Sequence, residues 1–226
     1  MHKSPFHTYK YDSLEWIGTS PEALPPLNEN WQARRELAAA LRRLNSAALG
    51  ADVASARFRA LAALVNNEAA RLEADKRLVG HQAQAERIDA EQGRYPDLAF
   101  EISPALGLSN AVAPPMHMWE AGGRIHGRVT ADWSYEGPFG HLHGGVIALL
   151  FDQLLGIGQR ISGTGGPTGT LTIRYHHPTP LNQPLRLEAD MVRVEGRKKF
   201  MVGALWAGEV RTATCEGIFI TPRPEA

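Results

Sequence analysis

One acidic side chain stands alone in an apolar stretch of the sequence. From His143 to Arg160 the chain reads HGGVIALLFDQLLGIGQR, and Asp152 is the only charged residue between those two ends. A carboxylate without a partner in such surroundings is costly, so it has either a chemical use or a structural partner. Sheltered from water, a carboxylate can acquire a raised pKa and act as a general base or nucleophile near neutral pH. The alternative is a structural role, in a buried ion pair or as a cap on another backbone segment.

A second chemical feature directly precedes this stretch. The segment GHLHGG, residues 140–145, places Gly144 and Gly145 where a helix is expected to begin. Free N–H groups and the positive end of the helix dipole meet at such a point, and glycines let another group approach the backbone closely. These are the components of an oxyanion hole. The alternative is that the glycines only permit a tight turn, with His143 as a packed or capping residue.

The spacing of the two features constrains how they can cooperate. Gly144 and Asp152 are eight residues apart, which on one helix is roughly 12 Å at 1.5 Å per residue. A base and an oxyanion donor must both lie about 3 Å from one reacting carbonyl. One copy of the helix cannot supply both groups, whereas two antiparallel copies across a two-fold axis can. The sequence therefore predicts a homodimer, or a dimer of dimers, with composite sites.

The elements that must position these residues have an α+β pattern. Hydrophobic periodicity predicts a helix over 144–161 and strands over 124–133, 168–176, 185–194, 200–206 and 210–221. The turns between the last four strands hold Pro178-Thr179-Pro180, Glu195-Gly196 and Ala207-Gly208, and hairpin loops this short predict antiparallel neighbours. A helix that is apolar all round cannot face water, so the sheet is expected to wrap around it.

Composition divides the chain into three segments. Residues 1–29 are rich in proline and aromatics and are expected to form an extended arm, residues 30–100 a helical extension, and residues 101–226 the α+β domain. In the extension, one amphipathic helix capped by Asn30 and ending at Gly50, followed by another capped by Asp52, predicts a helical hairpin. Residues 30–92 carry ten Lys and Arg against eight Asp and Glu. Because the signs are interspersed, a solvated helix face is favoured over a nucleic-acid-binding surface.

Charge and cysteine content exclude several classes of function. Among the 226 residues, 24 Lys and Arg balance 24 Asp and Glu, so no bulk field attracts nucleic acid or an anionic membrane. The single cysteine, Cys215, excludes an intramolecular disulfide and a cysteine-based metal cluster, and it favours a reducing compartment. No apolar run is long enough for a signal peptide or a membrane-spanning helix. We therefore expect a cytoplasmic protein without a membrane span.

Together these motifs resemble the PaaI-type acyl-CoA thioesterases, and within them the branch of thioesterase superfamily members 4 and 5. The resemblance covers about residues 119–222 and is carried by YEGPFGHLHGGVIALLFDQLLG, TGTLTIRYHHPTPL and VEGRKKF. Its specific part is HGG with Asp nine residues after the histidine, Thr sixteen residues after that Asp, and the later EGRK. The resemblance implies a hotdog fold, in which an antiparallel sheet wraps around one central helix. It also implies hydrolysis of an acyl-CoA thioester, with coenzyme A arriving as part of the substrate and no separate cofactor.

The resemblance also implies roles for individual residues. Asp152 would activate water or attack the thioester itself, and the Gly144 N–H would polarise the carbonyl, with Gly145 supporting the turn. His143 would help to shape the site, and Thr168 would orient water or substrate.

Two positions extend or depart from the pattern of the family. Thr170, expected on the same strand face as Thr168, is a further substrate-binding candidate, with plain β-propensity as the alternative. Many PaaI-type members carry an asparagine six residues before the HGG histidine, where this chain has Gly137. The member 4 and 5 branch also lacks that asparagine, so the departure does not exclude activity.

Coenzyme A carries phosphates, so a basic rim is expected near the pocket mouth. The sequence offers a cluster at one hairpin, made of Arg193, Arg197, Lys198 and Lys199. Surface lysines are also common at hairpins for no such reason. His176 and His177 lack further ligands at a plausible spacing, so no metal site is expected. Two other functions remain open: a non-catalytic acyl-CoA sensor, which the N-terminal helices would suit, and a hotdog dehydratase or hydratase, whose motifs are not found.

Overall fold

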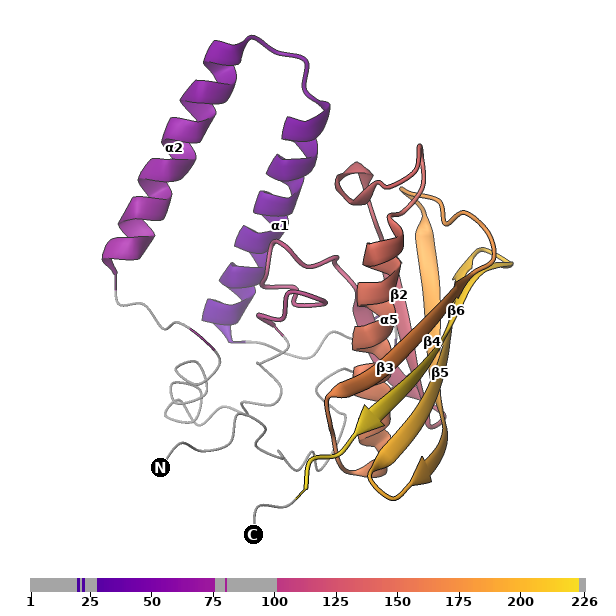
Figure 1. The fold of residues 1–226 in the computed structure, drawn as a ribbon. Coiled ribbons are helices and arrows are strands. Elements are labelled where there is room, and N and C mark those ends of the chain that lie inside the picture. The colour runs from indigo at the N-terminus through magenta and orange to yellow at the C-terminus, as the bar shows by residue number, and fades with distance from the viewer. Residues whose placement is uncertain (1–19, 21, 23–27, 76–79, 81–100, 224–226) are drawn as a thin grey trace.

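The computed structural model describes residues 20, 22, 28–75, 80 and 101–223. Most of the expected N-terminal arm and the end of the helical extension lie outside these residues. The rest forms an α+β domain, with one long helix against a six-stranded sheet and two further helices beside it (Figure 1). This is the hotdog arrangement that the sequence predicts, with its N-terminal helical extension.

All six strands belong to one antiparallel sheet. Their order across the sheet is β1-β2-β4-β5-β6-β3, so β1 and β3 form its two edges. Alternation of buried and exposed side chains along the inner strands puts one face against the helix and leaves the other outside. The strands are β1 (His117–Ala121), β2 (Arg124–Thr130), β3 (Thr168–Tyr175), β4 (Pro184–Glu195), β5 (Lys198–Ala207) and β6 (Val210–Ile220).

The central helix α5 (Gly144–Gly158) packs on the inner face of this sheet. Its buried face includes Leu150, Phe151 and Leu154, which meet the inward side chains of the strands in one core. The helix can approach the sheet closely because β6 has a glycine, Gly217, beneath it. A Cβ on Gly217 would lie 2.9 Å from Leu155 Cδ1, so β6 needs a glycine there. A short 3-10 helix, Gln159–Ser162, follows α5 and ends one residue beyond the predicted helical range.

The opposite face of α5 is not covered by the described residues. Ala148, Leu149 and Asp152 are only half-buried, and Gly145 is exposed. The sheet covers one side, and an apolar stripe carrying the lone carboxylate remains open.

The segment between β3 and β4 is not the hairpin that its short length suggests. β3 pairs with β6 at the sheet edge and β4 lies between β2 and β5, so the chain crosses from the edge to the middle of the sheet. On its way it passes the start of α5, where the Leu142 N–H donates to Thr179 O at 2.8 Å. The crossing thus brings residues 176–180 to the helix N-terminus.

The sequence prediction misses the first strand. β1 pairs with β2 through a tight turn in which Gly122 and Gly123 have φ of 63° and 75°. Two left-handed residues in succession are what a two-residue hairpin turn with the sheet's own twist requires. β2 also ends at Thr130, earlier than expected, because Asp132 caps a short 3-10 helix that begins at Trp133.

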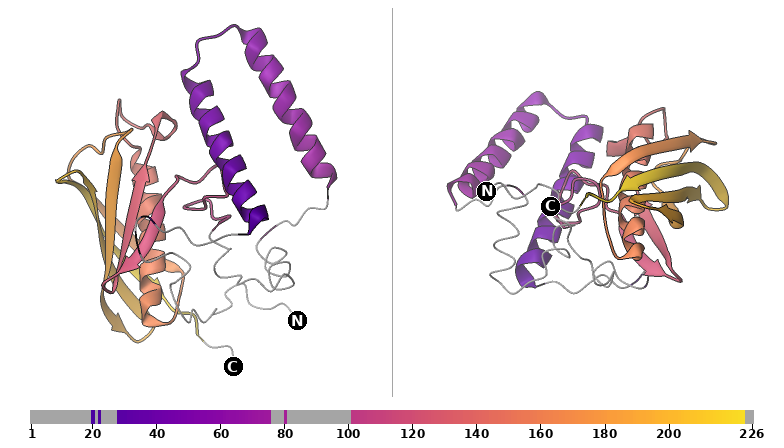
Figure 2. Two further views of the ribbon diagram at one scale, coloured as in Figure 1. Left: turned by 180° about the vertical axis from the view of Figure 1, so that it is seen from behind. Right: turned by 60° about the horizontal axis from the view of Figure 1, so that its bottom comes forward.

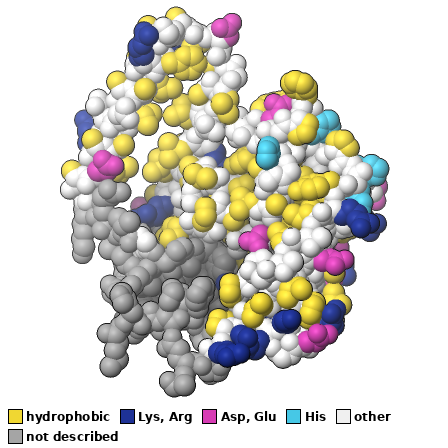
Figure 3. Space-filling model, viewed as in Figure 1, with side chains coloured by type: hydrophobic (Ala, Val, Ile, Leu, Met, Phe, Trp, Pro, Cys, Tyr) yellow, Lys and Arg dark blue, Asp and Glu magenta, His cyan; other side chains and the backbone are white. Residues whose placement is uncertain are grey.

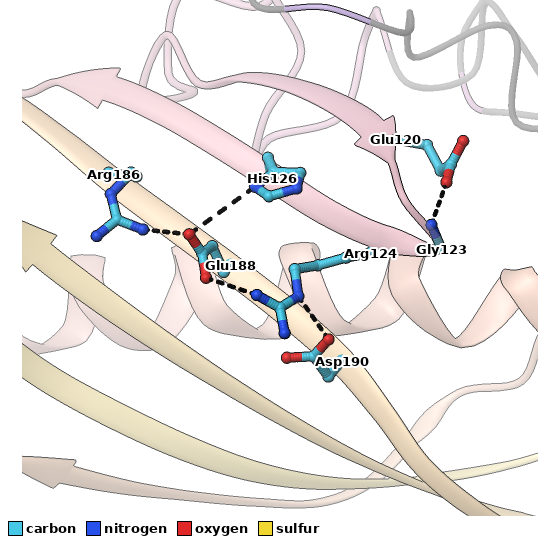
Figure 4. Close-up of polar contacts among 7 residues, drawn as sticks. All are labelled: Glu120, Gly123, Arg124, His126, Arg186, Glu188 and Asp190. Atoms are coloured by element: carbon cyan, nitrogen blue, oxygen red, sulfur yellow. Dashed lines mark hydrogen bonds and ion pairs between the residues drawn. The ribbon is translucent and has the colours of Figure 1, made fainter.

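The outer face of the sheet carries paired charges rather than an open charged patch. Arg124 bonds Asp190 at 2.7 Å and Glu188 at 3.1 Å, and Arg186 also pairs with Glu188 (Figure 4). His126 lies 4.0 Å from the same glutamate. These residues come from the neighbouring strands β2 and β4. They link β2 to β4 on the side of the sheet that faces away from α5.

The N-terminal helices are α1 (Glu29–Gly50) and α2 (Ser55–Ala74). α1 ends at Gly50 as expected, but its cap is Asn28, whose side chain accepts from the Trp31 N–H, rather than Asn30. α2 has no side-chain cap, so the expected role of Asp52 is wrong. Figure 2 shows α1 standing between α2 and the sheet domain. No helix in the described part of the chain is long and apolar enough to cross a membrane.

The two helices differ in how they meet the rest of the protein. α1 buries Trp31 and Ala38, whereas no residue of α2 is fully buried. Hydrophobic side chains therefore remain exposed along both helices (Figure 3). The largest of them are Leu37, Leu41, Leu49, Phe58, Leu64, Val65 and Leu72.

A largely buried ion pair fastens α1 to the domain. Both oxygens of Glu101 accept from the Arg35 guanidinium, and Ser109 Oγ donates to the same carboxylate at 2.8 Å. Replacing Arg35 with Met would leave Glu101 buried without its cation, which we expect to cost about 3–5 kcal/mol. Urea unfolding and limited proteolysis of α1 would measure this loss. Arg43→Met, at an exposed site of the same helix, is the matched control. Equal stability of the two variants would contradict this role.

Candidate active site

The lone carboxylate has a partner that comes later in the chain. Asp152 lies midway along the uncovered face of α5, and Thr168 Oγ1 donates to its Oδ1 at 2.7 Å. Thr168 is the first residue of β3, sixteen positions further on. The structure thus brings together the two residues that the family resemblance pairs. A carboxylate that accepts one hydrogen bond on one oxygen keeps its second oxygen available.

Thr168 reaches the helix because β3 is irregular at its start. Thr168 is opposite Phe219 of β6, but Thr170 is opposite the next residue, Ile218, so Gly169 is the extra residue of a β-bulge. Phe219 is buried on the inner face, and Ile218, its neighbour on a regular strand, faces outward. Thr168 therefore faces α5 and Thr170 faces away from it. The prediction that both threonines lie on the same face of the strand is wrong, and Thr170 is therefore not part of the candidate site.

The start of α5 leaves one backbone donor free. His143 caps the helix, and its Nδ1 accepts from the Gly145 N–H at 2.9 Å. In the neutral ring the proton is then on Nε2. Among the described residues, no acceptor is bonded to the Gly144 N–H. Of the two glycines, Gly144 is thus the one with an available donor, while Gly145 supports the turn by pairing with the histidine.

The close packing around His143 leaves no room for a side chain at Gly137, the position where many PaaI-type proteins carry an asparagine. A Cβ on Gly137 would lie 2.7 Å from His143 Cα, nearer than real side chains approach. An asparagine at this position would therefore displace the histidine that caps α5. On the other side of the helix start, Tyr175 Oη donates to Gly144 O at 2.9 Å. The ends of β3 thus contact both chemical features of α5, with Thr168 at the carboxylate and Tyr175 at the glycine.

A cavity of about 600 Å³ opens in front of the helix start. Gly144 and Gly145 form part of its wall, and apolar side chains together with histidines from the crossing segment form much of the rest. Asp152 and Thr168 are not among its lining residues. Within one chain, the cavity at the start of α5 and the carboxylate with its threonine are therefore separate, and we call them the two candidate half-sites.

The expected basic rim is smaller in the structure. At the β4–β5 hairpin Arg193 pairs with Glu195 and stacks on Phe200, and Arg197 donates to Thr221 O at 3.1 Å. Lys198 is exposed. Lys199 is only 2% exposed and its ammonium donates to Thr164 Oγ1 at 2.8 Å and to Thr164 O. Its predicted contact with a phosphate at the surface is therefore wrong, because alternation along β5 turns this side chain inward.

Burial of Lys199 gives folding a specific pH dependence. Desolvation, with the nearby charge of Arg160, lowers the pKa of Lys199 from 10.5 to about 8. Between these two values the unfolded chain binds more protons at this group than the folded chain. The free energy of unfolding should therefore rise with pH over that window, by up to ~1.4 kcal/mol per pH unit from this lysine. In Lys199→Met this contribution should vanish. Urea unfolding of both proteins between pH 8 and 10.5 measures the difference, and parallel curves would contradict it.

Neither the cysteine nor the potential metal ligands form a reactive site in the described part of the chain. Burial raises the pKa of the Cys215 thiol to about 12, so this cysteine is a packed core residue rather than a nucleophile. No three His, Cys, Asp or Glu side chains of the described residues gather where they could hold a metal ion. His176 instead contacts Thr214 Oγ1 at 2.9 Å.

Comparison with known proteins places this geometry in a family. A sequence profile described as Thioesterase superfamily matches residues 139–214, which include His143, Gly144, Asp152 and Thr168. A crystal structure described as a thioesterase superfamily protein is 33% identical and superposes with a TM-score of 0.71. That similarity covers 89% of this chain and 94% of the other. The chain belongs to the thioesterase superfamily. The resemblance to thioesterases that the sequence indicates is thus confirmed at the level of this superfamily.

Two curated relatives agree with the branch suggested by the sequence. Acyl-coenzyme A thioesterase THEM4 of Xenopus laevis is 38% identical over 65 residues, 29% of each chain. The protein of the same name from Bos taurus is 34% identical over 94 residues, which are 40% of this chain and 38% of that one. The thioesterase superfamily chain thus spans well under half the length of these relatives.

Proposed function

We propose that this protein hydrolyses an acyl-CoA thioester to a free carboxylic acid and coenzyme A. The observation that carries the proposal is the Asp152–Thr168 pair on the open face of α5. An aspartate held by a hydroxyl, at the edge of an apolar core, has the means to activate water or to attack a carbonyl. Support also comes from the two curated relatives, both of which are named acyl-coenzyme A thioesterase.

The reaction follows from what each group can donate or accept. Thr168 occupies one oxygen of Asp152, and the other oxygen takes a proton from water as that water attacks the thioester carbonyl. The negative charge that develops on the carbonyl oxygen is stabilised by the Gly144 N–H and the positive end of α5. Collapse of the tetrahedral intermediate breaks the C–S bond, and the thiolate of coenzyme A recovers the proton. In the alternative route Asp152 attacks first and water cleaves the resulting anhydride, with the same products.

The proposal includes a homodimer whose sites combine both half-sites. The β3 edge has no pairing partner among the described residues, and long unpaired edges are usually covered in native proteins. The half-buried stripe of α5 lies next to it, and Phe139, beside the cavity, is 99% exposed. Joining two copies across a two-fold axis, with antiparallel α5 helices, would cover these surfaces. It would also bring Gly144 of one protomer to Asp152 of the other.

Two separate regions of the protein are proposed to bind the two ends of the substrate. Arg197 and Lys198 are the basic groups proposed to meet the phosphates of coenzyme A, and the apolar cavity is proposed to receive the carbon chain next to the thioester. A cytoplasmic location is also part of the proposal, because the single cysteine is buried and unpaired.

Release of free thiol tests the proposal directly. The purified protein would be incubated with short-chain, long-chain and aromatic acyl-CoAs, and the freed coenzyme A would be measured with a thiol reagent. We expect turnover of at least one class, and its identity gives the acyl preference. Saturable binding of acyl-CoA with no thiol release from any substrate would overturn hydrolysis in favour of a sensor.

A further inference from the structure

Two buried polar side chains hold the loop that delivers Thr168. The loop, residues 163–167, connects the 3-10 helix after α5 to β3. Lys199 donates to both the carbonyl and the hydroxyl of Thr164, and Gln159 Nε2 donates to Gly166 O at 2.6 Å. Each of the two donors is only 2% exposed. Together they form a clamp, defined here as Lys199 and Gln159 on the 163–167 loop.

The clamp is aligned with the site by the register of the sheet. Lys199 is opposite Phe219 on β6, and Phe219 is opposite Thr168 on β3. The three residues therefore form one row across three strands, all facing α5. Gln159 reaches the same loop from the start of the 3-10 helix that directly follows α5, the helix that carries Asp152. The two anchors thus connect the loop to the strand row of Thr168 and to the helix of Asp152.

Contacts with β6 hold the end of the loop that lies next to Thr168. Its last residue accepts a backbone bond, Ile220 N–H to Pro167 O at 3.1 Å. A Cβ on Gly166 would lie 2.3 Å from Ile220 O, so glycine alone fits against β6. The β-bulge at Gly169 separates the Thr168–Phe219 pair from the regular β3–β6 pairing that resumes at Thr170, so Thr168 lies between the bulge and the clamped loop.

Burying a lysine costs stability, so its retention requires a gain elsewhere. We propose that Lys199, assisted by Gln159, is a positioning residue that keeps the Thr168 hydroxyl within bonding distance of Asp152. This inference rests on the proposed function, in which the Thr168–Asp152 bond orients the carboxylate. Lys199 is bonded to Thr164 rather than to Asp152 or Thr168, so its effect on the carboxylate is exerted through the loop.

The test compares Lys199→Met with Arg186→Met, which removes a cation from the outer face of β4. Amide hydrogen exchange over residues 164–170 should be faster in Lys199→Met than in Arg186→Met. Hydrolysis should show kcat lowered by roughly 10- to 100-fold with KM unchanged, because the carboxylate is misplaced rather than the substrate lost. Thr164→Val removes one acceptor of the clamp and should show a smaller change of the same kind.

A double-mutant cycle with Thr168→Val separates positioning from general destabilisation. If Lys199 acts through Thr168, the double variant should be no slower than Thr168→Val alone. Additive losses, or unchanged kcat in Lys199→Met, would overturn the inference. If the wild-type protein hydrolyses no acyl-CoA, the proposed function is wrong. The clamp is then tested by amide hydrogen exchange alone. Equal amide exchange over residues 164–170 in Lys199→Met and Arg186→Met would overturn the role of the clamp.

Discussion

Asp152→Asn should lower kcat for acyl-CoA hydrolysis by roughly 10²–10⁴ while the protein remains folded. Asparagine has the shape of aspartate, and its amide oxygen can still accept from Thr168. It cannot take a proton from water or attack the thioester, because it has no anionic oxygen. The loss should therefore appear in kcat, with binding of acyl-CoA retained. Steady-state thiol release and direct binding of substrate measure the two quantities.

The outer face of the sheet supplies the matched control. Asp190 pairs with Arg124 on the side away from α5, so Asp190→Asn makes the same chemical change outside the site (Figure 4). Its kcat should equal that of the wild-type protein. Near-normal hydrolysis by a folded Asp152→Asn protein would show that Asp152 is neither base nor nucleophile.

Gly144→Pro should lower kcat by roughly 10²–10³, the usual cost of removing one oxyanion donor. Proline lacks the N–H but fits the first position of a helix, where that N–H has no intrahelical partner. His143, which precedes it, has φ of −62° and ψ of 133°, an extended conformation that a following proline accepts. The variant thus removes the donor and preserves the helix start. Thiol release measures the loss.

Gly144→Ala separates loss of the donor from crowding of the cavity. Alanine keeps the N–H, and its Cβ would lie 3.4 Å from Tyr175 Oη, at ordinary contact distance. We expect nearly wild-type kcat. Similar losses in the alanine and proline variants would indicate a steric effect rather than a missing hydrogen bond.

Local patterns predicted most of the fold and both half-sites. The apolar run after HGG predicted α5 from its first residue, and its single charge directed attention to Asp152. Four of the strands were predicted to within two residues at each end, because their alternation and turns are encoded locally. The β1 strand was missed, although the glycine pair at 122 and 123 is the signal that would have found it.

The features that were not predicted depend on contacts between distant segments. The β3–β4 connection has the length of a hairpin, and only the whole sheet shows that it crosses the end of α5. The β-bulge at Gly169 turns Thr170 away from the site, and counting alternate residues along the strand does not reveal the bulge. Lys199 follows the cations Arg197 and Lys198, which suggests a surface position, but the register of β5 directs its side chain into the core.

Mixing two inactive variants tests the composite site most directly. Asp152→Asn and Gly144→Pro would be unfolded together and refolded at equal concentration, so that mixed dimers form. Each mixed dimer would contain one site with both an intact Gly144 N–H and an intact Asp152, and one site with neither. We expect recovery to about a quarter of wild-type activity, since half of the dimers are mixed and each has one working site. Mixed dimers that form but remain as inactive as their parents would contradict it.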